Sequence, residues 1–222
     1  ALRPHQIAAL GVARTFQNIA LSPRLSVRDN LMLGRHRLTK AGFLAAGLRL
    51  PSARREAARH GARVAEIAEF TGVGEVLDVP AGLLPYGMRK RVELARALCI
   101  EPRLLLLDEP VAGMNGGERR EMAELILAIR ESLGISILLV EHDMAMVMRI
   151  ADAVTVLDFG RRIAHGTPAE VQRDPEVIRA YLGGAAGDGA HDPRPADGAP
   201  EPGPADGAPE PGPAGQRAEA GR

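Results

Sequence analysis

Lysine is scarce in this 222-residue sequence, because Lys40 and Lys90 are the only two among 28 basic residues. The acidic residues also number 28, so the formal charge is zero. A chain without a basic excess has no general attraction for a polyanion, which argues against a nucleic-acid partner. The rarity of lysine also restricts the phosphate-binding motifs that the sequence can contain.

Cysteine is nearly missing too. Cys99 stands alone, so no internal disulfide can form and no second cysteine completes a metal site, which favours a reducing compartment. In the apolar segment ARALCI, Cys99 is typical of a small core residue rather than a reactive thiol. No apolar run reaches the length of a membrane span, and the first residues show no signal-peptide pattern. Those residues, ALRPHQIAAL, lack a methionine, and we expect the chain to be truncated there.

With 45% hydrophobic residues, the chain is long enough to bury the core of one main domain. After Leu182 the composition changes to Gly, Ala, Pro and Asp, and PADGAPEPG occurs at 195–203 and again at 204–212. Such a segment has almost nothing apolar to bury, so it is predicted to be disordered. A solvated tail is favoured over a tether or a partner motif.

The remaining sequence alternates short apolar runs with amphipathic segments, as α/β proteins do. The continuous hydrophobicity of the predicted strands favours a parallel sheet buried on both faces. Strands are expected at 104–108, 136–141 and 153–158, and helices at 88–100, 118–133, 143–151, 168–173 and 175–182. Thr167 and Asp174, each followed by a proline, are the predicted caps of the last two helices.

Residues 26–84 show no strand signal and predict an inserted helical subdomain. Ser26 is the predicted cap of a first helix, and Ser52 is the predicted start of a longer one that ends at Gly72. Within this region, AGFLAAGLRLP (41–51) fits either a helix packed on its own domain or an interfacial membrane helix, and packing is favoured.

The run LLLLDEP, residues 104–110, ends a predicted strand with two acids. At the carboxyl end of a strand in an open parallel sheet, Asp108 could hold Mg²⁺ through water. Glu109 points elsewhere and could polarise a water that attacks a phosphoryl group. Taken alone, the motif carries only moderate weight, because pairs of acids are common and the alternative is a strand that ends in two solvated acids.

A second motif, LLPYGMRKRVELARAL (83–98), places Gly87 at the start of an amphipathic helix. A helix N-terminus presents unpaired N–H groups and a positive dipole end, which suit a phosphate. Taken alone, an ordinary amphipathic helix is favoured here.

Two further polar residues fit the same kind of site. His142 directly follows a predicted strand, so its imidazole should emerge at the same sheet edge as the two acids, where it could bind a γ-phosphate. The amide of Gln17, in ARTFQN, could contact Mg²⁺-bound water.

Along the chain the order is Gln17, LPYGM, LLLLDEP, AGMN (112–115) and EHD. This order resembles the ATP-binding subunits of ABC transporters, over residues 1 to about 183. In that family the glutamine lies in the Q-loop, a Leu-Ser-Gly-Gly-Gln signature opens a helix, Walker B supplies the acids, and a D-loop and a switch histidine follow. The strings PHQIAALGVARTFQN, DEPVAGMN, VEHDMAMVM and DFGRRIAHGTPAEV, and an insertion between Gly34 and Arg55, resemble the branched-chain amino-acid import subclass.

The sequence departs from the family pattern at the signature. Here the motif is Leu84-Pro85-Tyr86-Gly87-Met88, so Pro85 replaces the serine whose hydroxyl would contact the partner's γ-phosphate. Gly87 and the helix N-terminus are then the expected phosphate contacts, and the change to Met88 removes the glutamine amide.

The phosphate loop is the second departure. That loop needs Gly-Lys followed by Ser or Thr. Neither lysine here follows a glycine, since Lys40 follows Thr39 and Lys90 follows Arg89. We expect the loop to lie in a missing N-terminal segment, and the chain alone to be inactive.

The resemblance implies a partial ABC-ATPase nucleotide-binding domain with a parallel-sheet α/β core. Its expected parts are a Q-loop region at 1–25, a helical subdomain at 26–87, the α/β core with Walker B, D-loop and switch histidine at 88–183, and a disordered tail at 184–222. ATP and Mg²⁺ are the implied ligands. The implied catalytic residues are Glu109, as general base, and His142; the implied nucleotide-binding residues are Gln17, Asp108, Pro85, Tyr86, Gly87, Met88 and Asn115, and the metal ligands Asp108 and Gln17.

The implied partners are a second ABC ATPase, identical or related, the transmembrane permease subunits and, indirectly, a solute-binding protein, with the ATPase peripheral at the cytoplasmic face of the inner membrane. ATP hydrolysis would drive the permease between inward- and outward-facing states, with branched-chain amino acids the expected cargo. One alternative is a non-catalytic fragment that binds partners but not ATP alone. An ABC protein acting on DNA or ribosomes is disfavoured by the neutral charge and the lack of a coiled coil.

Overall fold

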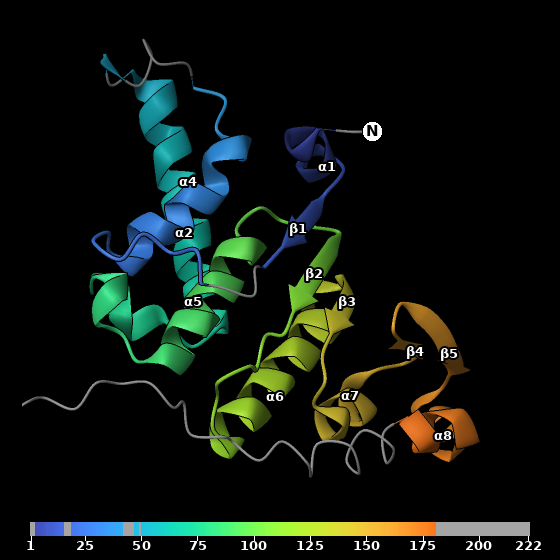
Figure 1. Ribbon diagram of the computed structural model, residues 1–222. Helices are drawn as coiled ribbons and strands as arrows, with labels where there is room; N and C mark the ends of the chain where they lie inside the picture. Colours follow the sequence, from blue (N-terminus) through green and yellow to red (C-terminus); the bar gives the residue numbers. More distant parts are fainter. Residues whose placement is uncertain (1–2, 16–18, 42–46, 49, 181–222) are drawn as a thin grey trace, which may run out of the picture. The chain divides into compact units, whose positions relative to one another are not determined.

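The structure, a computed structural model, describes residues 3–15, 19–41, 47–48 and 50–180 (Figure 1). Gln17, most of the apolar segment 41–51 and the predicted tail 184–222 lie outside these residues. No helix in the described ranges is long and apolar enough to cross a membrane.

Three parallel strands, β1 (Val12–Arg14), β2 (Leu104–Asp108) and β3 (Ser136–Val140), form a sheet in that order (Figure 1). Leu104 pairs with Val12 on one side and with Ser136 on the other. The strands are therefore aligned, and the segments that follow them leave from the same edge. This is the edge where open parallel sheets bind ligands.

The sheet is buried on one face only. Leu105 and Leu107 of β2 are buried, whereas Leu138 and Val140 of β3 are 58% and 57% exposed. The prediction of burial on both faces is therefore wrong for the described residues. Apolar content alone does not show whether one or both faces of the sheet are covered, because the strand sequence is continuously apolar in either case.

The fourth predicted strand lies in a separate hairpin. β4 (Val154–Asp158) pairs antiparallel with β5 (Arg161–Gly166), so its placement in the parallel sheet was wrong and β5 was not foreseen. Phe159 and Gly160 join them with φ values of 44° and 80°. Two consecutive positive φ values are characteristic of tight hairpin turns.

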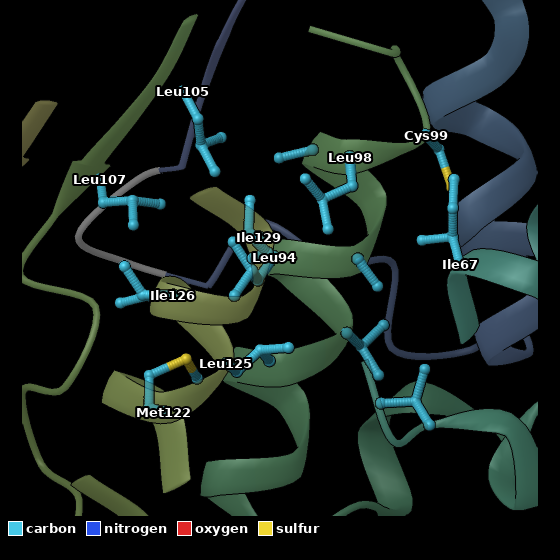
Figure 2. Close-up of a cluster of buried hydrophobic side chains, with 14 of the residues drawn as sticks. Ile67, Leu94, Leu98, Cys99, Leu105, Leu107, Met122, Leu125, Ile126 and Ile129 are labelled. Atoms are coloured by element: carbon cyan, nitrogen blue, oxygen red, sulfur yellow. The ribbon is translucent and has the colours of Figure 1, made fainter. Parts of the chain in front are cut away.

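Two helices, α5 (Tyr86–Leu98) and α6 (Gly116–Leu133), supply the layer over the buried face of the sheet (Figure 2). The central side chains of the core between these helices and the sheet are Leu94, Leu98, Leu105, Leu107, Met122, Ile126 and Ile129. Cys99 belongs to the same cluster, and burial raises the pKa of its thiol to about 12. The prediction that it is a core residue is confirmed.

The region between β1 and β2 is helical in its described residues. α2 (Val27–Arg35) begins after Ser26, whose hydroxyl accepts the N–H of Asp29 at 3.1 Å, as predicted. α4 (Pro51–Phe70) begins one residue before the predicted Ser52. Proline at the first helical position explains the difference, because its fixed φ suits a helix start.

The remaining elements are α1 (Pro4–Ala9), η1 (His36–Leu38), η2 (Gly74–Val76), η3 (Ala81–Leu83), α7 (Met144–Ile150) and α8 (Pro168–Arg173). Residues 175–180 are also helical. Both predicted caps are confirmed, since Thr167 accepts the N–H of Glu170 and Asp174 accepts the N–H of Glu176.

A buried arginine connects α2 to α4 and to the end of α5. Arg35 donates from Nε to Nδ1 of His60 at 2.8 Å, and from one terminal nitrogen to the carbonyl of Cys99 and the carboxylate of Glu101. The hydrogen bond from Arg35 lowers the pKa of Glu101. The helices are thus joined by polar as well as apolar contacts.

We expect the substitution Arg35→Met to lower the free energy of unfolding by about 2–4 kcal/mol, because it leaves His60 Nδ1 and the Cys99 carbonyl without their donor. Since the folded-state pKa of Glu101 is lowered, its stabilisation is present above the ordinary carboxyl pKa and is lost as pH falls through the lowered value. Arg35→Met should weaken that loss. Urea denaturation at several pH values measures both effects.

Arg28→Met is the matched control, because Arg28 lies on the same helix as Arg35 and forms only an exposed ion pair with Asp78, which lies outside that helix. It should leave the urea midpoint almost unchanged. Equal destabilisation by the two substitutions would contradict the role given to Arg35.

Candidate functional site

Asp108 is the last residue of β2, and its side chain is held at the edge of the sheet. Its Oδ2 accepts a hydrogen bond from a terminal nitrogen of Arg14, the last residue of β1, at 2.9 Å. The Asp108 side chain is 31% exposed, so it is accessible to a ligand. Asp108 therefore lies where the sequence placed it, but with an arginine partner that the sequence did not predict.

Glu109 turns away from the strand direction in an unusual backbone conformation. Its φ is 45°, in the left-handed region that residues other than glycine seldom adopt. The Glu109 N–H donates to the carbonyl of Val140 at 2.9 Å, which continues the pairing of β2 with β3 and anchors the turn. A conformation of this kind costs free energy, which the contacts around the turn must offset.

Glu141 fastens the segments that leave β2 and β3. Its side chain is fully buried, with an exposure of 0%. Oε1 accepts the N–H of Val111 at 3.1 Å, and Oε2 accepts the N–H of His142 at 3.1 Å. One carboxylate thus satisfies a backbone donor on each of two neighbouring loops and fixes their spacing.

His142 reaches the acidic pair from the next strand, as predicted. Its Nδ1 lies 3.5 Å from Oε1 of Glu109, and its side chain is 75% exposed. The structure therefore brings Asp108, Glu109 and His142 to one edge of the sheet, with the imidazole and the carboxylate both open to solvent.

The signature motif opens α5 without a side-chain cap. Pro85 is the N-cap residue, and the first turn holds Tyr86, Gly87 and Met88 but no acid. The Tyr86 ring is half-exposed, and the guanidinium carbon of Arg89 lies 5.7 Å from its centroid. The helix start therefore has a guanidinium close by, but Gly87 itself is buried and the Glu118 carboxylate lies beside it.

Asn115 caps the neighbouring helix α6. Its Oδ1 accepts the N–H groups of Gly117 and Glu118, and Oε2 of Glu118 accepts the N–H of Asn115 in return. This capping box positions Asn115, which is exposed. The Asn-x-x-Glu spacing of residues 115 and 118 is the sequence pattern of such a cap.

The beginnings of α5 and α6 lie against each other. A Cβ on Gly87 would be 2.5 Å from Oε1 of Glu118, and a Cβ on Gly113 would be 3.2 Å from the Tyr86 ring. A side chain at Gly87 would displace the Glu118 carboxylate, and a side chain at Gly113, whose φ is 75°, would press on the Tyr86 ring. The signature helix and the D-loop residues therefore form one packed unit.

Three residues of this site were missed at the sequence level: Arg14, Glu118 and Glu141. Among the described residues, no group of three or more His, Cys, Asp or Glu side chains is arranged to hold a metal ion. Gln17, the other predicted metal ligand, lies outside those residues.

Comparisons with known proteins show the family to which the chain belongs. A family model described as "ABC transporter" matches residues 3–112, and one described as "Branched-chain amino acid ATP-binding cassette transporter" matches residues 161–187. A crystal structure of an ATP-binding cassette of an ABC transporter in its ADP conformation superimposes with a TM-score of 0.67 and 28% identity, over 82% of this chain and 72% of that one.

Two curated relatives are more similar to this chain in sequence than that crystal structure is. The high-affinity branched-chain amino acid transport ATP-binding protein LivG of Escherichia coli K12 is 42% identical over 180 residues, which are 81% of this chain and 71% of LivG. Its counterpart BraF of Pseudomonas aeruginosa is 39% identical over 181 residues, 82% of this chain and 71% of BraF. The chain therefore belongs to the family of ATP-binding subunits of branched-chain amino acid ABC transporters.

Proposed function

We propose that this subunit hydrolyses ATP to drive the import of branched-chain amino acids, with Glu109 and His142 as its catalytic residues. The observation that carries the proposal is their approach to 3.5 Å at the carboxyl edge of the sheet, with Glu109 in left-handed backbone. The Glu109 carboxylate would take the proton of the attacking water as general base. The exposed imidazole of His142 would hydrogen-bond the γ-phosphate.

Asp108 fits the role of a magnesium ligand. It offers one partly exposed carboxylate at the carboxyl end of β2, which Arg14 also contacts. This donor set suits Mg²⁺, which keeps most of its waters and takes one or two carboxylates together with phosphate oxygens. The bound ion would neutralise charge on the phosphates. Gln17 remains a proposed second contact.

The nucleotide would lie between two subunits. The beginning of α5 would offer the backbone of Pro85, Tyr86, Gly87 and Met88 to the phosphates of a partner ATPase, and Asn115 would lie at the same interface. Permease subunits would hold the pair at the cytoplasmic side of the membrane and receive the motion, with a solute-binding protein delivering the cargo.

A phosphate loop would come from residues outside the 222. The chain contains no Gly-Lys followed by Ser or Thr. β3 has only one neighbouring strand in the described sheet, and its apolar residues Leu138 and Val140 are exposed. A phosphate-loop strand and the helix behind it would pair with this edge and cover this face. The 222 residues alone would then be an inactive fragment.

Glu109→Gln in the assembled transporter is expected to lower kcat for ATP hydrolysis by about 10²–10⁴-fold, because the amide cannot accept the proton of the water. Steady-state phosphate release measures the effect. Glu131→Gln, at the exposed end of α6, is the control and should turn over normally. Undiminished hydrolysis by Glu109→Gln would reject the general-base role.

MgATP titrated into the 222-residue chain alone should not saturate below about 1 mM, because no lysine and hydroxyl pair is present to hold the β- and γ-phosphates. Calorimetry measures the affinity directly. Saturation at micromolar concentration would show that these residues form a complete phosphate site. That result would contradict the proposal that they form only half of the nucleotide site, here called the half-site.

A further inference from the structure

Arg14 occupies a defined place beside the proposed metal ligand. It pairs in register with Leu106, and Asp108 lies two residues further along β2. Leu105 and Leu107 point into the core, so the alternation of β2 places Leu106 and Asp108 on the open face. The Arg14 side chain reaches along this face to Asp108.

A charged hydrogen bond joins the two side chains in a partly solvated position. One terminal nitrogen of Arg14 lies 2.9 Å from Oδ2 of Asp108, and the two side chains are 56% and 31% exposed. A guanidinium remains charged at every pH at which the protein is folded, so Asp108 carries a cation before any metal arrives. An exposed ion pair of this kind is weak enough for a second cation to compete with it.

We propose that Arg14 is a positioning residue that acts as the resident counter-ion of Asp108 and gives way to a divalent cation, Mg²⁺ or Mn²⁺, when the metal binds. Without metal, the guanidinium neutralises the carboxylate and keeps it at the sheet edge. With metal, the two cations repel each other, and Arg14 leaves Asp108. The inference rests on the proposed role of Asp108 as metal ligand.

This exchange gives Arg14 an effect on metal affinity with a definite sign. Removing the guanidinium removes a competitor, so a metal should bind Asp108 more tightly. A purely structural ion pair gives the opposite sign or none, because loss of the partner would loosen the carboxylate without relieving competition.

The test is a titration of the 222-residue chain with Mn²⁺, followed by paramagnetic broadening of the His142 ring protons in NMR spectra. We expect Arg14→Gln to lower the half-saturating Mn²⁺ concentration about three- to ten-fold, and Arg14→Lys to restore most of the original value. Thermal unfolding of each variant establishes that it is folded. Unchanged or weaker Mn²⁺ binding by Arg14→Gln would overturn the proposal.

Arg28→Gln is the matched control, because Arg28 forms an ion pair of the same 2.9 Å length with Asp78 on a different part of the chain. It should not change the broadening at His142, and tighter binding in this variant would overturn the proposal by showing a general charge effect. Asp108→Asn tests separately whether Asp108 is a metal ligand and whether Arg14 competes with the metal. This substitution should abolish the broadening of the His142 protons. If the broadening persists, Asp108 is not the metal ligand, and the proposed role on which the exchange rests is wrong.

Discussion

The site depends on the buried carboxylate of Glu141. Parallel pairing of β2 with β3 brings Asp108 level with Val140, and the next residues of both strands then leave the sheet together. Glu141 accepts N–H groups from Val111 on one loop and His142 on the other. A carboxylate buried in this way is stable only when such donors satisfy it. It therefore holds the backbone of His142, whose Nδ1 lies 3.5 Å from Oε1 of Glu109.

The open face of the sheet links the fold to the proposed half-site. Asp108 and Arg14 lie on this face, beside the exposed apolar residues of β3. Parallel sheets are ordinarily covered on both faces, so the uncovered side is where further structure is expected. The sequence contains no Gly-Lys followed by Ser or Thr. The proposal that the phosphate-binding layer comes from residues other than these 222 would explain both observations.

The sequence predicted the features that are encoded locally. The apolar run ending at Asp108 predicted β2, and a histidine directly after the next apolar run predicted the meeting of His142 with Glu109. Glu141 was missed because its burial depends on an N–H donor from Val111, thirty residues away in the chain. Arg14 was missed because β1 is only three residues long, too short to show a periodic pattern.

Local sequence also could not assign each strand to its sheet. The run that became β4 is apolar enough for a parallel strand, yet it pairs with β5 across the turn at Phe159 and Gly160.

Amide hydrogen exchange in Glu141→Ala tests most directly whether the Glu141 carboxylate holds the loops of Val111 and His142 in place. The account predicts exchange at Val111 and His142 that is faster by about tenfold or more, with Leu105 in β2 unchanged. Unchanged protection of Val111 would contradict it.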